Sequence, residues 1–221
     1  MSGFSTARQK MVDGQVRTND VTDSRIIEAM LALPRELFVP EGKQALAYLD
    51  LDLDVTTGGS PPRYMIKAQV IAKMLQAALI EASDNVLVVG CATGYAAALA
   101  ARLAAKVTAL ESDPGLVAKG NYVLAQLGFA NVTMRTGPAA DGASADAPYD
   151  VIILNGATEV TPERLFEQLA EGGRLVGVFA ANRPARAMIV TRSHGDFGHR
   201  ALFDAAAPVL PGLERHASFV F

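Results

Sequence analysis

A short turn bounded by two glycines is the part of the sequence best suited to binding a ligand. It reads Gly-Cys-Ala-Thr-Gly-Tyr and follows the apolar run Val-Leu-Val-Val at 86–89. In open α/β sheets, ligands bind beyond the carboxyl ends of the strands, where a helix start offers free backbone amides. Gly90 permits a tight turn, and Gly94 permits close packing of the next helix. We therefore expect Gly90, Cys91, Gly94 and Tyr95 to line a ligand site.

An acid lies at the end of the next predicted strand. Glu111 follows the run at 106–110, 21 residues after Gly90. A carboxylate there can accept two hydrogen bonds from the hydroxyls of a ribose. The glycines do not have the Gly-x-Gly-x-x-Gly spacing, which disfavours a dinucleotide site and an NAD-dependent reductase. The alternative is that Glu111 only caps the helix expected from Pro114; we favour the ribose.

The segment Pro-Arg-Tyr-Met-Ile-Lys at 62–67 has the position of a site entrance. It contains no serine, threonine, histidine or carboxylate, but Arg63, Tyr64 and Lys67 could donate hydrogen bonds to an anion. The competing interpretation, which we favour, is that Arg63 and Lys67 are solvated flanks of a helix start. Ile66 extends the apolar stripe of that helix, as a packed residue would.

The cysteine and the histidines offer weaker candidates. Cys91 lies in a turn at a helix start, which can lower a thiol pKa. No His or Asp lies near it in sequence, so a packing role is favoured. His194, His199 and His216 lie in the C-terminal region and match no metal-ligand spacing. We expect no metal site and place these histidines on the surface or in a hairpin.

Strands and helices alternate along the second part of the chain. Apolar runs predict strands at 86–89, 106–110, 131–136, 150–155 and 174–179, with helices at 94–103, 114–127 and 162–170. This alternation predicts a doubly wound α/β fold with a mostly parallel, Rossmann-like sheet. The segments 188–192 and 200–209 flank a glycine-bearing loop at 193–198 and predict an antiparallel hairpin, which brings the sheet to seven strands.

The first part of the chain predicts helices and irregular connections. Its clearest helix spans 64–82, where apolar residues recur with a helical period. We expect a single domain over 1–221. Within it, residues 1–83 form an N-terminal helical cap and substrate-side segment, and residues 84–221 form the Rossmann-like core.

Composition and charge exclude several classes of function. The net charge of −3, the pI near 5.6 and the lack of a Lys/Arg run argue against a nucleic-acid partner. No apolar stretch approaches about 20 residues, so no membrane span is expected. The N-terminus lacks the apolar segment of a secretory signal, and a single cysteine fits a reducing compartment. We expect a cytoplasmic globular protein.

Longer stretches carry a resemblance to a known family. They include VTDSRIIEAMLALPRELFVPEG, VLVVGCATGYAAALAA, VTALESDP and APYDVIILNGA. Over nearly the whole chain, the sequence resembles the protein-L-isoaspartate O-methyltransferase family. The resemblance implies a class I methyltransferase fold, and carboxyl methylation of L-isoaspartyl residues in damaged proteins or peptides. It also implies an S-adenosylmethionine cofactor, held by Gly90, Cys91, Gly94, Tyr95, Glu111 and Gly137.

Several motif positions depart from that family. Before the long helix the family reads roughly Gly-Gln-Thr-Ile-Ser-Gln-Pro, and its serine holds the substrate carboxylate. An ungapped count places the serine on Ile66 and the threonine on Tyr64. The family's glutamate late in the first strand is Val88, its middle glycine is Ala92, and its Gly-Asp-Gly turn reads Gly-Pro-Ala at 137–139.

Three functions are compatible with this pattern. The first is isoaspartyl carboxyl methylation, as the family resemblance implies. The second is methyl transfer to a different acceptor, with Arg63, Tyr64 or Lys67 lining a remodelled pocket. The third is a non-catalytic binding or interaction protein on the same scaffold. The sequence does not identify which residue takes the part of the missing serine.

Overall fold

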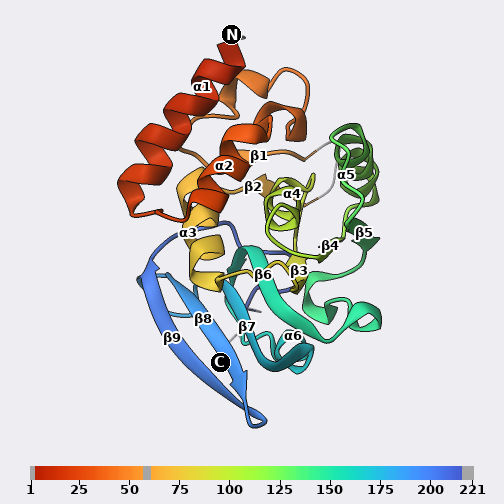
Figure 1. Ribbon diagram of the computed structural model, residues 1–221. Coiled ribbons are helices and arrows are strands. Elements are labelled where there is room, and N and C mark those ends of the chain that lie inside the picture. The colour runs from red at the N-terminus through yellow and green to blue at the C-terminus, as the bar shows by residue number, and fades with distance from the viewer. Residues whose placement is uncertain (1–2, 57–60, 216–221) are drawn as a thin grey trace, which may run out of the picture.

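The chain is built around one large sheet (Figure 1). The computed structural model describes residues 3–56 and 61–215. Its seven-stranded sheet has the order β5-β4-β3-β6-β7-β8-β9, parallel from β5 to β7 and antiparallel from β7 to β9. The strands are β3 (Asn85–Val89), β4 (Lys106–Glu111), β5 (Val132–Thr136), β6 (Tyr149–Thr158), β7 (Leu169–Phe179), β8 (Arg186–Ser193) and β9 (Asp196–Asp204). The predicted α/β class, mostly parallel sheet and terminal antiparallel hairpin are confirmed.

Helices cover both faces of this sheet. They are α1 (Gly3–Met11), α2 (Ser24–Ala32), α3 (Ala68–Ala78), α4 (Tyr95–Ala101), α5 (Pro114–Gln126) and α6 (Glu163–Glu167). Short helical turns lie at η1 (Val12–Val16), η2 (Arg17–Asn19), η3 (Arg35–Phe38), η4 (Gln44–Leu46), η5 (Ala139–Asp141) and η6 (Ser144–Asp146). Figure 1 shows α1 and α2 together at one end of the molecule and the β8–β9 hairpin at the other. In the described part of the chain, no helix has the length and apolar character needed to span a membrane.

The run at 86–89 fills two cores because it is apolar on both faces. Val86 and Val88 join a large cluster with residues of α2, α3 and α4. Leu87 and Val89 join a smaller cluster with α6 and the segment after β9. Such two-sided burial is typical of a parallel strand covered on both faces. It explains why a continuous apolar run, rather than an alternating one, predicted β3.

The helix predicted at 64–82 is wrong at both ends. Its first residues form the strand β2 (Tyr64–Met65), which pairs antiparallel with β1 (Leu53–Asp54) in a separate two-stranded sheet. The Lys67 amide donates to Asp52 Oδ1 at 3.0 Å, and the helix begins only at Ala68. At the other end Leu79 adopts a left-handed conformation with φ 49°, which stops the helix. Strand pairing sets the first end and a left-handed residue sets the second, and the apolar period indicates neither.

Two other predicted boundaries also shift. The helix expected at 162–170 ends at Glu167, because Leu169 already pairs with Tyr149 as the first residue of β7. The loop expected at 193–198 is reduced to His194 and Gly195, whose φ values of 53° and 83° give a tight two-residue turn. The strands β8 and β9 are therefore longer on the turn side than the sequence indicated.

One arginine fastens the end of α3 to the sheet. From β7, Arg174 Nε donates to Ala78 O at 2.6 Å, and Nη2 donates to Leu79 O at 2.7 Å. Nη2 also forms an ion pair with Asp84 at 2.9 Å, with side chains 18% and 9% exposed. Carbonyls at a helix end have no partner within the helix, so Arg174 supplies one from another element.

We expect Arg174→Gln to lower the free energy of unfolding by about 2–4 kcal/mol, because it leaves a buried carboxylate and two carbonyls without their charged donor. Urea denaturation measures this change. The matched control is Arg186→Gln, which breaks an exposed ion pair with Asp204 and should cost less than about 1 kcal/mol. Equal effects of the two substitutions would contradict the role given to Arg174.

Candidate functional site

The glycine turn and the acid meet at the carboxyl ends of neighbouring strands. β3 and β4 are parallel and adjacent, and the Cys91 amide donates to Leu110 O at 3.0 Å. From the end of β5, the Gly137 amide donates to the backbone carbonyl of Glu111 at 3.0 Å. The structure thus places Gly90, Cys91, Glu111 and Gly137 at one edge of the sheet.

The turn requires left-handed backbone at three positions. Gly90, Ala92 and Gly94 have φ values of 67°, 50° and 93°. At Ala92 this conformation costs an L side chain about 1–2 kcal/mol, which glycine would avoid. A Cβ on Gly94 would meet Leu124 at an ordinary contact distance of 3.4 Å. The left-handed backbone, and not the close packing that we expected, therefore requires glycine at this position. The close approach is made instead by Gly120 in α5, where a Cβ would lie 2.6 Å from a side chain of β5.

The Glu111 carboxylate is buried and holds several segments of backbone together. Its side chain is 0% exposed. Oε1 accepts from the amides of Ser112 and Asp113 at 2.7 and 3.1 Å, and Oε2 accepts from the Ala92 amide at 2.9 Å. The alternative that Glu111 caps α5 is wrong, because Asp113 is the cap and accepts from Gly115 N at 2.7 Å. Glu111 is therefore oriented toward the glycine turn.

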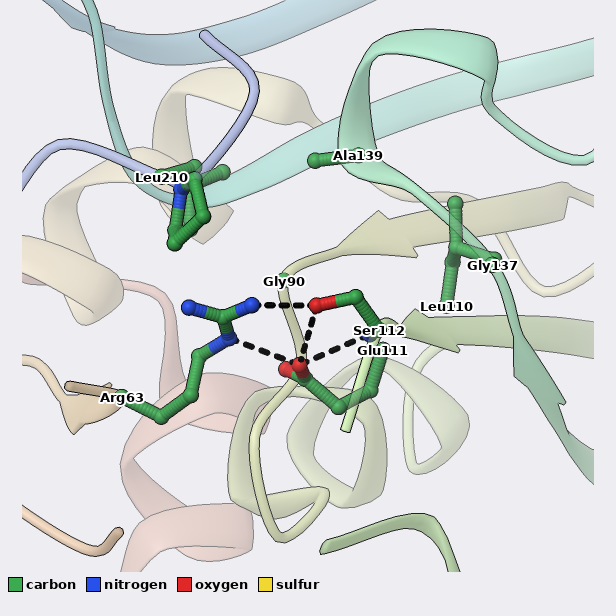
Figure 2. Close-up of a pocket in the computed structure, with 9 residues that line it drawn as sticks. Arg63, Gly90, Leu110, Glu111, Ser112, Gly137, Ala139 and Leu210 are labelled. Atoms are coloured by element: carbon green, nitrogen blue, oxygen red, sulfur yellow. Dashed lines mark hydrogen bonds and ion pairs between the residues drawn. The ribbon is translucent and has the colours of Figure 1, made fainter. Parts of the chain in front are cut away.

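Arg63 lies directly against this carboxylate (Figure 2). Its Nε donates to Glu111 Oε1 at 2.7 Å, and a second guanidinium nitrogen donates to the Ser112 hydroxyl. The Arg63 side chain is only 6% exposed. The interpretation of Arg63 as a solvated helix flank is therefore wrong, because β2 turns it inward. Tyr64 and Lys67, by contrast, are each half-buried.

Two small pockets adjoin the Arg63–Glu111 pair. The first is closed by its own walls, with a cavity volume of about 0 Å³. It is lined by Arg63, Gly90, Leu110, Glu111, Ser112, Gly137, Ala139, Leu210 and Pro211. The second, with a cavity volume of about 10 Å³, is lined by Pro62, Arg63, Tyr64, Gly90, Asn155, Pro208, Val209, Leu210 and Pro211. Sites for small molecules usually exceed about 300 Å³, so side chains must move before either pocket can hold a cofactor.

Leu210 closes the space between these pockets. A Cβ on Gly90 would meet Leu210 Cδ2 at 2.3 Å, so this side chain lies directly on the turn. The segment that carries it is tied to β6, where Leu210 N donates to Ala157 O at 2.9 Å. No local sequence pattern pointed to Leu210, because its contacts come from distant pairing. Figure 2 shows Leu210 and Arg63 projecting into the same region.

Asn155 is a further site residue that the sequence reading missed. It lies in β6, and its Nδ2 donates to the Gly90 carbonyl at 2.9 Å. A polar residue after the apolar run 151–154, near the carboxyl end of a parallel strand, was the available signal. Asn155 holds the glycine turn against the second pocket.

Neither pocket is lined by Ile66, Lys67, Cys91, Gly94 or Tyr95. Ile66 is 1% exposed within the main core. Tyr95 packs edge-on against Phe38, with ring centroids 5.4 Å apart, beneath the Arg35 guanidinium, so it joins α4 to the N-terminal segment. Cys91 is 1% exposed. Burial, and secondarily the Glu111 charge, raise the pKa of its thiol well above the usual range, which supports the packing role.

Metal ligands do not gather in the described structure. Across 3–56 and 61–215, His, Cys, Asp and Glu form no group of three that could hold a metal ion. His194 lies in the β8–β9 turn and His199 in β9. His216 lies outside the described residues.

Comparison with known proteins decides the family. The family model described as Protein-L-isoaspartate(D-aspartate) O-methyltransferase (PCMT) matches residues 6–201. The chain belongs to the protein-L-isoaspartate O-methyltransferase family. A Koribacter versatilis protein with that enzyme name is 39% identical over 176 residues, covering 80% of this chain and 78% of its own. An Anaeromyxobacter relative is 40% identical over 171 residues, covering 77% and 69%.

Solved structures agree with this fold. A protein-L-isoaspartate O-methyltransferase superposes with a TM-score of 0.82 at 24% identity, covering 94% of this chain and 67% of its own. A putative family member from Plasmodium falciparum, in complex with S-adenosyl-L-homocysteine, gives 0.76 at 16% identity, covering 95% and 99%. The family resemblance in the sequence is thus confirmed, and the fold is that of S-adenosylmethionine-dependent methyltransferases.

Gly90→Ala should destabilise the chain through its contact with Leu210. The matched control is Gly128→Ala, because Gly128 has a similar φ of 76° but no atom within 4 Å of its ideal Cβ. We expect Gly90→Ala to lower the free energy of unfolding by about 1–3 kcal/mol more than the control, as overpacking does. Urea denaturation compares the two variants. Equal decreases in the free energy of unfolding would show that the Leu210 side chain can move aside without cost.

Cys91 should be inert in the folded chain. We expect iodoacetamide at pH 8 to label it at least about a thousandfold more slowly than in urea, because reaching the thiol requires opening that costs about 5 kcal/mol or more. Mass spectrometry follows the reaction at the single cysteine of the chain. Rapid labelling without denaturant would mean that the glycine turn opens readily.

Proposed function

We propose that this chain is an S-adenosylmethionine-dependent carboxyl O-methyltransferase that acts on L-isoaspartyl residues of damaged proteins. The observation that carries the proposal is the Glu111 carboxylate, held rigidly at the end of β4 beside the turn at Gly90. A fixed carboxylate at this place suits the two hydroxyls of a ribose. Family membership supports the reaction and the acceptor. We also propose a cytoplasmic location, supported by the free, buried thiol.

The donor set and walls of the first pocket fit the adenosyl part of this cofactor. Glu111 would accept from the ribose hydroxyls, and Gly90 and Gly137 place no side chain of their own between the backbone and a ligand. Leu110 and Ala139 supply apolar walls for a base. Space is the remaining requirement, and it depends on the side chains of Arg63 and Leu210. Cys91, Gly94 and Tyr95 would act indirectly, by holding the turn.

Methylation of a carboxylate requires no proton transfer by the protein. A free carboxyl group has a pKa of about 4 and is ionised at neutral pH, so no general base is needed. The cofactor supplies a methyl group bonded to a positively charged sulfur. That carbon would bond to a carboxylate oxygen of the acceptor as its bond to sulfur breaks, and the sulfur would keep the electron pair. The chain's own task is to hold the acceptor oxygen in line and to exclude water.

A second candidate is methyl transfer to a different acceptor. Ile66 favours it, because the position of the family's serine is a buried apolar side chain that lines neither pocket. An acceptor held in the family manner would find no hydroxyl there. A non-catalytic relative is the third candidate, and it would bind no cofactor productively.

Calorimetry with S-adenosylhomocysteine and a methyl-transfer assay on an L-isoaspartyl peptide test the proposal. We expect binding and transfer by the wild-type chain. Glu111→Gln should weaken S-adenosylhomocysteine binding by about 10- to 100-fold, because it removes a charged acceptor. The matched control Glu28→Gln, at an exposed position of α2, should leave binding unchanged.

The outcomes separate the three candidates. Binding without transfer to the isoaspartyl peptide would favour a different acceptor. Absence of binding in the wild-type chain would favour the non-catalytic relative. Because Glu111→Gln leaves Arg63 without its carboxylate, thermal melting of each variant accompanies the titrations. A folded Glu111→Gln variant with wild-type affinity would refute the ribose assignment.

A further inference from the structure

In the Arg63–Glu111 ion pair, the carboxylate proposed to bind the ribose contacts the arginine that could donate to an acceptor anion. Both side chains are nearly inaccessible, 6% and 0% exposed, and they lie 2.7 Å apart. Arg63 also borders both pockets, whereas Glu111 borders only the first. Arg63 therefore stands between the place proposed for the ribose and the neighbouring pocket.

The hydrogen bonds of Glu111 leave little capacity for a ribose. A carboxylate has about four acceptor positions on its two oxygens. Oε1 already accepts from Arg63 and from the amides of Ser112 and Asp113, and Oε2 accepts from the Ala92 amide. The Ser112 hydroxyl, 3.3 Å from Oε1, also points at this carboxylate.

Of these donors, Arg63 is the one whose departure would empty the pocket. The three amides are fixed in the turn and at the start of α5, so they cannot leave without unfolding local backbone. The Ser112 hydroxyl can rotate in place. Arg63 has a long side chain with several rotatable bonds, so a ribose on Glu111 would displace its guanidinium.

A displaced Arg63 needs another anion, because a buried charge without a partner is strongly unfavourable. The second pocket is the adjacent space that it already lines. Among the described residues that line this pocket, Arg63 is the single charged one, accompanied by the polar side chains of Tyr64 and Asn155. A carboxylate is the group that a guanidinium binds best, with two parallel hydrogen bonds.

We infer that Arg63 exchanges partners during the reaction: it pairs with Glu111 in the cofactor-free chain and with the acceptor's carboxylate once the ribose takes Glu111. This inference rests on the proposed function and names the residue that replaces the family's serine. It makes the two ligands cooperative, because cofactor binding frees the cation that the acceptor requires. Such coupling is reciprocal, so the acceptor also strengthens cofactor binding.

Titrations of an L-isoaspartyl peptide, with and without saturating S-adenosylhomocysteine, measure this coupling. In the wild-type chain we expect the peptide to bind about tenfold or more tightly when S-adenosylhomocysteine is present. In Arg63→Gln the peptide affinity should be low and equal under both conditions. The same variant should bind S-adenosylhomocysteine about tenfold more tightly than the wild type, because no guanidinium competes for Glu111. Its kcat/KM for the peptide should fall by about tenfold or more.

Two further variants control for folding and charge. Arg63→Lys keeps the cation and should recover part of the peptide affinity and of the coupling. Arg186→Gln makes the same chemical change at the exposed ion pair with Asp204 and should behave as the wild type. Thermal melting confirms that each variant is folded.

The results separate this inference from the proposed function. If Arg63→Gln weakens S-adenosylhomocysteine binding and keeps the coupling, Arg63 is structural and the exchange is overturned. A wild-type chain that binds S-adenosylhomocysteine and methylates the peptide without coupling also overturns the exchange, while the proposed function stands. Absence of S-adenosylhomocysteine binding in the wild type overturns the proposed function itself.

Discussion

A buried carboxylate is the constraint on which the site depends. Glu111 has no exposed side-chain surface, so its charge must be met by donors from the protein. Those donors come from the glycine turn, from the segment before α5 and, through Arg63, from the residue that precedes β2. One charge therefore fixes three segments that are far apart in sequence.

The segment before α3 combines a buried apolar side chain with a buried cation. Ile66, which an ungapped count of the sequence predicts at the family's serine position, lies in the core and has no hydroxyl. Arg63, three residues earlier, reaches the edge of the sheet because β2 pairs with β1 and directs it inward. A bulky apolar residue at one position is thus accompanied by a cation at a neighbouring one. This arrangement suits a carboxylate acceptor held by charge.

The parts of the fold that sequence predicted are those governed by local burial. The run at 86–89 is apolar on both faces, and β3 is buried on both faces. The segment at 64–67 shows the limit of this reading. Met65 and Ile66 fit a helical apolar stripe, yet Tyr64 and Met65 are extended because β1 supplies their hydrogen bonds. An apolar period does not distinguish these outcomes when a partner strand lies elsewhere in the chain.

The sequence by itself determined the α/β class and the family, and it predicted the place of the site, since strand ends, glycine turns and a terminal acid are local features. Only the tertiary structure decided what fills that site. The sequence pattern predicts a solvated Arg63 and gives no sign of Leu210, yet both side chains line the pocket at Gly90. Their positions follow from pairing with β1 and with β6. Such contacts join residues distant in the chain, so no local pattern encodes them.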